Sequence, residues 1–281
     1  MAPLDTGFPA SDARDDFSRA RRRHALASLA ARLRREPGDV AVVLPFEEVV
    51  EALGRVSERS LGLQTIALDS IVGTVGRTRE FDRSFRPTSN RTRDRWERIA
   101  DAQRRGEAMP PIEVYRIGDV HFVRDGHHRV SVARAQGRKE IDAYVTEVTT
   151  RVPIDRGTSV RELPLKGHER LFRERVPLAD AEFAEVRLSD PWQYGSLAEG
   201  VEAWGFRHAH GRRELLSREE VARVWLEEEF RPVVAMLHDA DLVGQGTAAD
   251  AYLRVAAERY RLMRTHEWSD EVIARLRREL D

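Results

Sequence analysis

Apolar side chains recur every three or four residues in two stretches near the start of the chain. In residues 16–35 they form one stripe with arginines on the remaining faces, and a proline and a glycine follow directly. Residues 45–56 carry a second, shorter stripe of the same spacing. This spacing is typical of helices with one buried face. We therefore predict an N-terminal helical segment over residues 1–62, which ends in a linker at 57–62.

Between residues 63 and 150 the pattern changes to short apolar runs that alternate with helix-like stretches. The dipeptide Gly118-Asp119 separates two such runs and is a strong signal for a two-residue hairpin. An arginine-rich loop is expected at 72–91. Together these elements predict a small α+β domain with a mixed sheet. The predicted elements are strands at 63–71, 112–116, 120–124 and 141–148 and helices at 92–105 and 128–136.

The chain becomes mostly helical after a stretch rich in proline and glycine at 151–167, which we interpret as a linker. Ser217 and Glu220 form the sequence pattern of a capping box. They open a helix that Pro232 is expected to kink or split. The predicted fold class is therefore α+β, with N-terminal helices, a mixed-sheet domain over residues 63–150 and a mainly α-helical domain over residues 168–281.

The chain contains no cysteine. This composition excludes disulfide bonds, thiolate zinc sites and cysteine nucleophiles. No apolar run approaches the roughly 18 residues that a membrane span needs, and the first residues lack the apolar core of a signal peptide. We therefore expect a cytoplasmic protein with no membrane partner.

Charge is distributed unevenly, although the net charge is only −1. Residues 76–105 hold ten arginines against five acidic residues, whereas residues 168–281 hold 17 basic against 23 acidic residues. A basic first half is compatible with a polyanionic ligand. Candidate nucleic-acid contacts in this half are Arg21, Arg22 and Arg23. The alternative is that these arginines only line a solvated helix face.

Residues 125–129, Asp-Gly-His-His-Arg, are the strongest candidate for a functional site. They lie where a predicted strand passes through a tight turn into a helix. A helix start presents unpaired backbone N–H groups and a partial positive charge, so it is a ready anion site. Gly126 lets a ligand approach the backbone closely.

Side chains of the same pentapeptide add to this anion site. His127 and His128 bring ring N–H donors, and Arg129 can contact a phosphate with two N–H groups at once. Asp125 could coordinate Mg²⁺ or accept a proton from a hydroxyl. These residue types suit a phosphate group bound with a metal ion. The alternative is that the two histidines cap the helix while Arg129 pairs with a nearby acid.

The pentapeptide also belongs to a longer pattern. A Pro-Ile-x-Val strand at 111–114, the hairpin, the pentapeptide and a helix of small residues at 132–137 follow one another in this order. With this pattern the block from 68 to 148 resembles the ParB/sulfiredoxin domain. The resemblance implies that the pentapeptide holds the phosphates of a nucleotide, and that Arg77 and Arg79 in the preceding loop supply basic contacts to it.

Three branches of this family imply three functions. Sulfiredoxins need a cysteine between the glycine and the arginine of the pentapeptide; this chain has His127 there, which excludes that activity. ParB chromosome-partitioning proteins bind CTP and read DNA through a basic helix-turn-helix, whereas an acidic segment follows here. Free-serine kinases of the same fold carry Asp-Gly-His-His-Arg and use a glutamate base, for which Glu80 is the nearest candidate.

We therefore expect a ParB-like protein that binds a nucleoside phosphate, CTP or ATP/ADP, with Mg²⁺. Two alternatives stay open. One is a small-molecule phosphotransferase or NTPase, in which Asp125 and Glu80 are the catalytic carboxylates and Asp125 is also the metal ligand. The other is a partition-type DNA-binding protein. The whole chain also resembles bacterial proteins with a short N-terminal helical segment, this domain and a helical tail, and the tail is a candidate homodimer contact.

Overall fold

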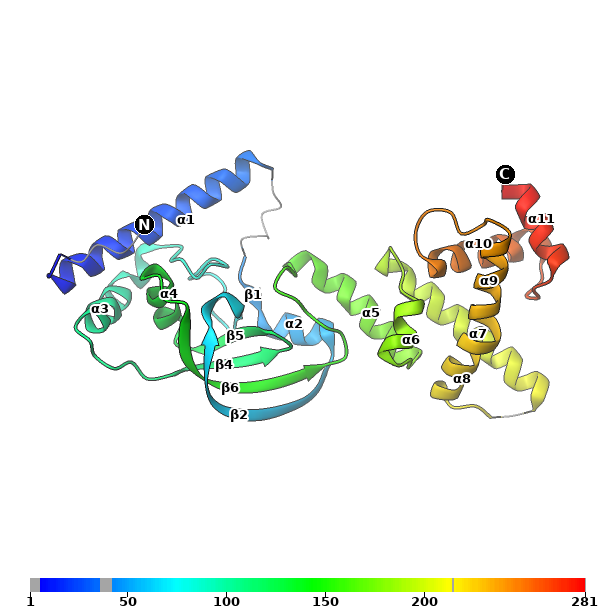
Figure 1. The fold of residues 1–281 in the computed structure, drawn as a ribbon, viewed down its shortest axis with the longest axis horizontal. Coiled ribbons are helices and arrows are strands. Elements are labelled where there is room, and N and C mark those ends of the chain that lie inside the picture. The colour runs from blue at the N-terminus through cyan, green and yellow to red at the C-terminus, as the bar shows by residue number, and fades with distance from the viewer. Residues whose placement is uncertain (1–5, 36–41, 214, 281) are drawn as a thin grey trace. The chain divides into compact units, whose positions relative to one another are not determined.

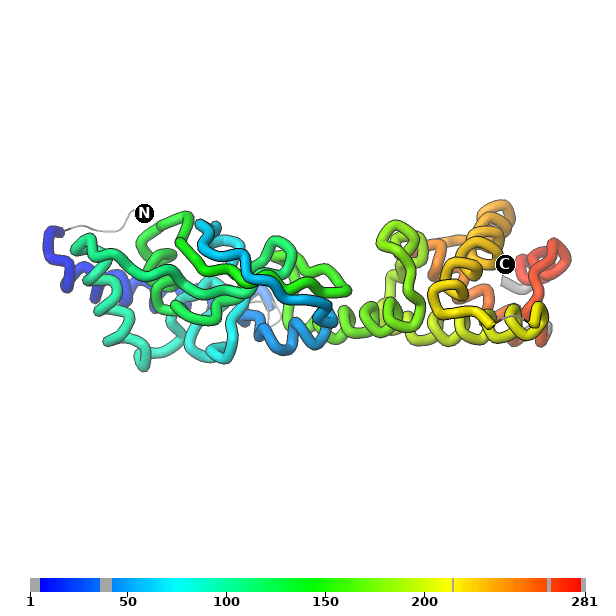
Figure 2. Tube along the Cα trace, turned by 90° about the horizontal axis from the view of Figure 1, so that it is seen from below, coloured from blue at the N-terminus to red at the C-terminus, as the bar shows by residue number. Residues whose placement is uncertain are grey.

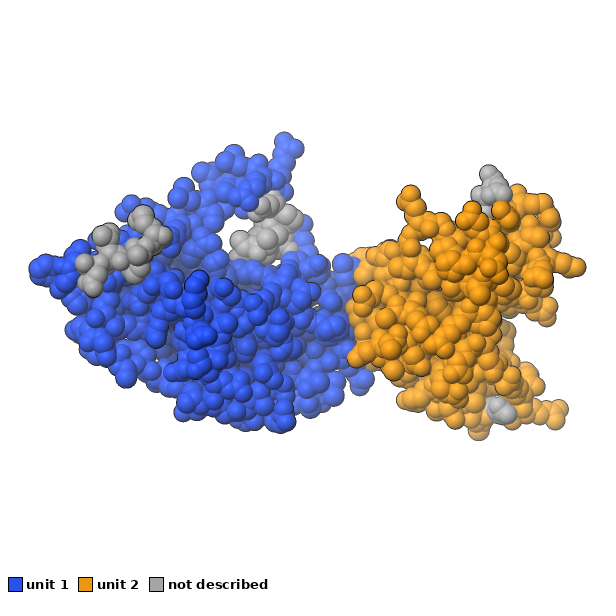
Figure 3. Space-filling view, in the orientation of Figure 1, with its two compact units in different colours: residues 1–167 blue, residues 168–281 orange. Residues whose placement is uncertain are grey.

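The structure is a computed structural model of the chain, and it describes residues 6–35, 42–213 and 215–280. The chain divides into two compact units, Met1–Gly167 and His168–Asp281 (Figure 3). Each unit has a hydrophobic core of its own, because the buried clusters of the first unit share no residue with that of the second. The strands belong to the first unit, and the second is helical (Figure 1).

The first unit is built on a six-stranded mixed sheet with the spatial order β1-β3-β5-β4-β6-β2. Its strands are β1 (Leu44–Pro45), β2 (Arg55–Ala67), β3 (Ile71–Thr74), β4 (Ile112–Ile117), β5 (Val120–Asp125) and β6 (Glu140–Thr150). β2 and β6 form a long antiparallel ladder and run side by side in Figure 2. β4 and β5 form the hairpin, whereas β4 with β6, β3 with β5 and β1 with β3 are parallel pairs.

Helices cover both faces of this sheet. α4 (His127–Ala135) contributes to one buried cluster and α2 (Phe46–Leu53) to another. Successive side chains of a strand point to opposite faces. Accordingly, Phe122 of β5 packs against Phe46 with ring centroids 5.5 Å apart, while Val123 lies in the cluster under α4. The two clusters therefore lie on opposite faces of the sheet.

Two further helices, α1 (Pro9–Leu33) and α3 (Arg93–Arg104), pack together with α4. Trp96 is completely buried between them, and its ring meets that of Phe17 edge-on with centroids 5.5 Å apart. Its indole N–H donates a hydrogen bond of 2.8 Å to the Ser131 hydroxyl. A buried indole usually needs such a partner, so this contact sets how α3 lies on α4.

The hairpin and the other strands and helices predicted between residues 92 and 148 are confirmed to within about two residues, the usual uncertainty of element ends. The strand predicted at 63–71 is interrupted. A 3₁₀ turn at Leu68–Ser70 separates β2 from β3, and the Ser70 hydroxyl donates to the Ala67 carbonyl at 2.6 Å. This side-chain bond to the backbone favours a turn over a continuing strand.

The predictions for residues 1–62 need a larger correction. Residues 57–62 are not a linker, because they lie within β2 and pair with β6. β2 is an edge strand with mostly exposed side chains, so its sequence lacks the apolar alternation of a half-buried strand. Residues 1–62 are not a separate segment either. They add β1 and much of β2 to the sheet, and Asp16 of α1 forms an ion pair of 2.5 Å with Arg104 of α3.

The predicted linker at 151–167 is wrong in its second half. A 3₁₀ turn at Val160–Glu162 leads directly into α5 (Leu163–Arg175). Ser159 opens this turn with a capping box, in which its N–H donates to the Glu162 carboxylate at 2.6 Å. Pro164, the second residue of α5, does not stop the helix.

Helices of the second unit surround one buried core. The rings of Trp225, Phe230 and Tyr252 lie against one another at its centre, with centroids 5.2–5.9 Å apart. The predicted capping box is confirmed: the Ser217 N–H donates to Glu220 at 2.7 Å, and the Glu220 N–H donates back at 3.2 Å. The helices after α5 are α6 (Asp180–Glu185), α7 (Tyr194–Arg212), α8 (Arg218–Trp225), α9 (Arg231–Asp239), α10 (Ala248–Met263) and α11 (Asp270–Leu280).

A π-helical turn at Leu226–Phe230 stands where the proline was expected to kink or split the helix. The backbone stays helical from α8 through this turn into α9, so Pro232 lies inside a longer helical run, and the wider turn stands directly before the residue that lacks an N–H. Of the helices in the described part of the chain, none has the length and apolar character of a membrane span.

Gly73 tests the packing of the sheet. A Cβ atom on this residue would lie 2.1 Å from the Phe122 ring and 2.7 Å from the Leu44 carbonyl oxygen. We expect Gly73→Ala to lower the free energy of unfolding of the first unit by about 1–3 kcal/mol, the usual cost of overpacking. Urea titration followed by NMR signals of β5 measures it. Gly167→Ala, where a Cβ meets open space, is the control, and equal stability of both variants would contradict the packing.

Candidate functional site

The start of α4 is shaped by a left-handed glycine. Gly126 has a φ of 97° and precedes the helix without any side-chain cap on the first-turn N–H groups. A Cβ at this position would lie 2.4 Å from the side chain of Ile112, so both the conformation and the space require glycine. Uncapped N–H groups give a helix start its partial positive charge. The pentapeptide thus forms the strand–turn–helix arrangement expected of it.

The two histidines of the pentapeptide are buried. The His127 Nε2 atom lies 2.6 Å from the Thr74 hydroxyl, so this ring bonds within the protein and does not cap the helix. The His128 Nδ1 atom is buried and has no hydrogen-bond partner among the described residues. Burial, with a smaller contribution from the charges of Arg77 and Arg95, lowers the pKa of both rings to about 4. Both rings are therefore neutral at pH 7.

The loop after β3 lies against this helix start. The Phe81 ring meets the His128 ring edge-on, with centroids 5.3 Å apart. The Glu80 carboxylate accepts two hydrogen bonds from Arg77, at 3.0 and 3.1 Å, and about two fifths of each side chain is exposed. Both charges are near enough to shift the pKa of His127 and of its neighbour. The structure therefore brings the loop and the pentapeptide together.

Arg129 has another role than the one expected from its position. Its guanidinium donates to the carbonyls of Pro110 and Pro111, at 2.5 and 2.8 Å, and forms an ion pair of 2.6 Å with Asp125. Only 13% of this side chain is exposed, whereas the Asp125 side chain is 61% exposed. Arg129 therefore connects the segment before β4 to the start of α4. It pairs with an acidic side chain, as expected in the alternative in which the pentapeptide has only a structural role.

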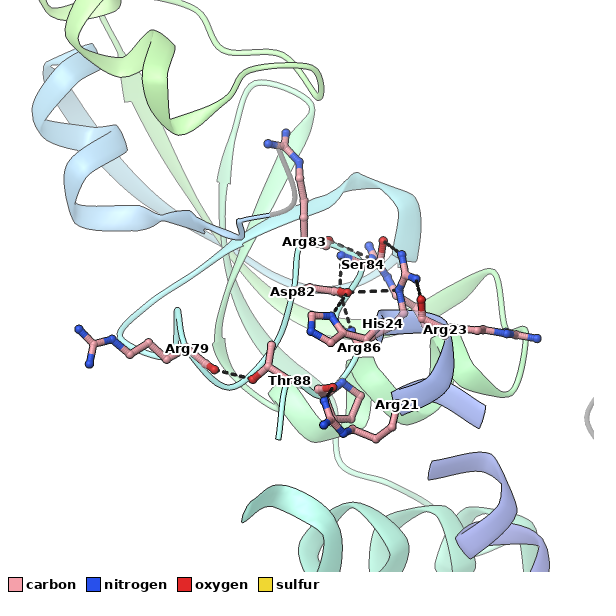
Figure 4. A network of polar contacts seen from close by, with 11 residues as sticks. Arg21, Arg23, His24, Arg79, Asp82, Arg83, Ser84, Arg86 and Thr88 are labelled. Atoms are coloured by element: carbon pink, nitrogen blue, oxygen red, sulfur yellow. Dashed lines mark hydrogen bonds and ion pairs between the residues drawn. The ribbon is translucent and has the colours of Figure 1, made fainter. Parts of the chain in front are cut away.

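Sequence reasoning missed two residues of this site. Thr74, the last residue of β3, holds the His127 ring. Arg95 is exposed on the first turn of α3 and is the charge that most lowers the pKa of His128. Neither carries a local signal, because each approaches α4 only through the tertiary fold. Arg79, by contrast, is exposed, and its side chain points away from the Asp82 contacts (Figure 4).

A polar network around Asp82 joins this loop to α1 (Figure 4). The carboxylate accepts the backbone N–H groups of Ser84 and Arg86, both at 2.9 Å. It also contacts the His24 ring at 2.9 Å and the Arg86 guanidinium at 3.3 Å. One buried carboxylate therefore fixes both the shape of the loop and its position on the helix.

The three consecutive arginines of α1 differ in their surroundings. Arg21 donates to the Pro87 carbonyl at 2.9 Å, and Arg22 is exposed. The carbonyl of Arg23 accepts a hydrogen bond of 2.8 Å from Arg86, while its own guanidinium extends away from the network (Figure 4). Of the three side chains, that of Arg21 is therefore held by the protein, while Arg22 and Arg23 remain exposed.

The donor set for a metal ion is sparse. Within the described ranges, no three histidine, aspartate or glutamate side chains are grouped to hold a metal ion. Asp125 and Glu80 are the carboxylates of the site, and each is paired with an arginine. Mg²⁺ usually keeps several waters and binds through one or two carboxylates together with substrate phosphates. The residues present thus fit an ion that enters with a phosphate ligand, and not a preformed metal cage.

Comparisons with protein-family models, with curated proteins and with solved structures gave no match. The resemblance to the ParB/sulfiredoxin domain therefore rests on the residues of the chain and stays a prediction.

The buried histidines predict a pH dependence of stability. The unfolded chain has an ordinary histidine pKa of 6.5, whereas His127 titrates at about 4 in the folded protein. As the pH falls below 6.5, the unfolded state takes up protons that the folded state does not, so stability is lost. Between pH 7 and pH 5 this loss is about 2 kcal/mol for one such histidine.

His127→Gln removes this titration. We expect the loss of unfolding free energy of the first unit between pH 7 and pH 5 to be about 2 kcal/mol smaller in the variant. Urea titrations at both pH values, followed by NMR signals of β5, measure the difference. His210→Gln, at an exposed position of α7, should behave like the unmodified protein. An unchanged pH dependence in His127→Gln would show that this ring is accessible to protons.

Proposed function

We propose that the start of α4 binds the phosphate groups of a nucleoside phosphate. The observation that carries the proposal is the uncapped helix start beside two guanidinium groups, those of Arg77 and Arg95. Backbone N–H groups at a helix start and nearby arginines are the donors that phosphate oxygens prefer. The side chains of His127 and Arg129 already bond within the protein, so the backbone and the two flanking arginines are the proposed phosphate contacts.

The ParB-like character of the domain is part of the same proposal. The pentapeptide supplies the left-handed glycine, and the exposed carboxylate of Asp125 stands beside the helix start. Mg²⁺ would enter with the nucleotide, with Asp125 and Glu80 as the carboxylates within the site. CTP and the adenine nucleotides differ in their base, so a comparison of their affinities shows which of them the site prefers.

Titration of the full chain with CTP, ATP, ADP and GTP in the presence of Mg²⁺ tests this proposal. We expect one of them to bind saturably by calorimetry and to raise the melting temperature, because a ligand that binds only the folded state stabilises it. Arg77→Gln and Arg95→Gln should each weaken binding about tenfold, the loss of one charge-assisted contact.

Arg98→Gln is the matched control, because Arg98 is an exposed arginine one turn further along α3. Its affinity for the nucleotide should equal that of the unmodified protein. Absence of saturable binding by all four nucleotides at millimolar concentration would overturn the proposal.

The position of Glu80 favours phosphoryl transfer as a second candidate function. Its carboxylate is near both histidines of the pentapeptide, although Arg77 holds it in the structure described here. We propose that it could take the proton of an acceptor hydroxyl once a phosphate competes for Arg77. With Mg²⁺, ATP or ADP and free serine, mass spectrometry would detect phosphoserine. Glu80→Gln should lower its rate at least about a hundredfold, and absence of product excludes this candidate for serine.

A further inference from the structure

A cavity lies at the other end of α4 from the proposed nucleotide site. It has a volume of about 340 Å³ and lies between α1, residues 84–86, the second half of α4 and the turn into β6. Small-molecule pockets begin at about 300 Å³, so the cavity is large enough for a phosphorylated compound of small size. One carboxylate, that of Asp69, lines it. The cations that line it are Arg23, Arg86, Arg134, Arg138 and Lys139.

Most of this positive charge is not neutralised by the protein. Arg86 pairs with Asp82 at 3.3 Å. Arg23, Arg138 and Lys139 form no ion pair with any carboxylate in the described part of the chain. The end of α4 contributes about half a negative charge from its backbone dipole, which is much less than the cations supply. The cavity therefore carries an excess of positive charge.

Arg134 is a half-buried cation of this cavity. It donates to the carbonyls of Leu68 and Ile71, at 2.5 and 2.9 Å, and lies over the Phe85 ring at 5.4 Å. Its Nε atom is buried without a hydrogen-bond partner, and among the described residues no carboxylate forms an ion pair with it. Burial accordingly lowers the pKa of this guanidinium. Asp69 and Asp82 partly offset this effect from beyond ion-pair distance. A partly desolvated charge is costly, so an anion in the cavity would stabilise it further.

Two hydroxyl groups complete the lining. Ser131 accepts the hydrogen bond of the Trp96 indole at 2.8 Å, and Ser84 accepts one from Arg86 at 3.1 Å. Since each oxygen already accepts from the protein, its own hydrogen remains for an acceptor in the cavity. The lining thus combines several cations and two neutral hydroxyl donors with a single carboxylate, that of Asp69.

We propose that this cavity binds a phosphomonoester or diphosphate group of a small molecule, at a site separate from the start of α4. Phosphate oxygens accept hydrogen bonds from guanidinium, ammonium and hydroxyl donors, and a dianion matches the uncompensated charge. The helix α4, of nine residues, is about 13 Å long. Its two ends can therefore hold different ligands at the same time.

Calorimetric titration of the full chain with pyrophosphate at low ionic strength, in buffer without Mg²⁺, tests the proposal. Inorganic phosphate and glycerol 3-phosphate are titrated in parallel, which separates a diphosphate from a phosphomonoester ligand. We expect saturable binding of at least one of these probes, and this binding should persist when the cations at the start of α4 are removed. The double variant R23Q/K139Q, which removes two unpaired cations and keeps their approximate size, should weaken binding at least tenfold.

Two controls separate this site from others. Arg22→Gln removes the neighbouring exposed arginine, which does not line the cavity, and should leave the affinity unchanged. The pair R77Q/R95Q removes the cations at the start of α4, so binding that persists in this variant belongs to the cavity. Arg138 is left intact because it lines a second cavity beside residues 106–111 as well.

Four outcomes of the titrations with the small probes would overturn the proposal. The first is that none of the three probes binds saturably, and the second is that R23Q/K139Q binds with the affinity of the unmodified protein. The third is that Arg22→Gln weakens binding as much as R23Q/K139Q does. The fourth is that only R77Q/R95Q weakens binding. The last outcome would assign the anion to the start of α4. A short DNA duplex is titrated as well. If R23Q/K139Q weakens binding of the duplex and leaves the small probes unaffected, the cavity is a nucleic-acid contact and the small-molecule proposal fails.

Discussion

The contact between Gly126 and Ile112 is the constraint on which the first unit depends. A Cβ atom at Gly126 would overlap the Ile112 side chain at 2.4 Å, and the backbone turns with a φ of 97°. These two conditions let β5 pass directly into α4 without an intervening loop. Because α4 starts immediately at the end of β5, its uncapped N–H groups stand beside the loop that carries Arg77 and Glu80. The same short turn places the far end of the helix against α1.

Arginine has two physical roles in this unit. Arg129, Arg134 and Arg21 donate to backbone carbonyls, so they hold turns and chain segments in place. A guanidinium presents five donors in a rigid plane and remains charged when it is partly buried, which suits it to this task. Other arginines, such as Arg95 and Arg23, are left without an ion pair in the described part of the chain and give the two proposed anion sites their charge. A high arginine content by itself distinguishes neither role.

The elements predicted well are those whose signals are local. The hairpin at Gly118, the turn at Gly126 and the capping box at Ser217 each depend on residues within a few positions of one another. The errors occur where packing overrides the local pattern. Residues 57–62 are polar and were expected as a linker, yet they pair with β6 because the edge of the sheet accepts a strand with exposed side chains.

Much of the candidate site was also predictable, but its internal contacts were not. The pentapeptide and the loop with Arg77 and Glu80 could be selected as parts of one site, and the fold does bring them together. The partner of His127, however, is the hydroxyl of Thr74, which is 53 positions away in the chain. Periodicity and spacing carry no information on such a contact, since it forms only when β3 and β5 pair.

The sequence by itself determined the local conformations of this protein: the helix periods, the turns that need glycine, the caps and the absence of thiol chemistry. Only the tertiary structure decided which side chains remain available for a ligand. Arg129 lies in the pentapeptide, the strongest candidate motif of the chain, but its guanidinium already donates hydrogen bonds to the backbone carbonyls before β4. Arg95 belongs to no motif, and yet the fold brings its charge near His128 at the start of α4. The physical reason is that hydrogen-bond partners are set by distances in space, which depend on the packing of the whole unit.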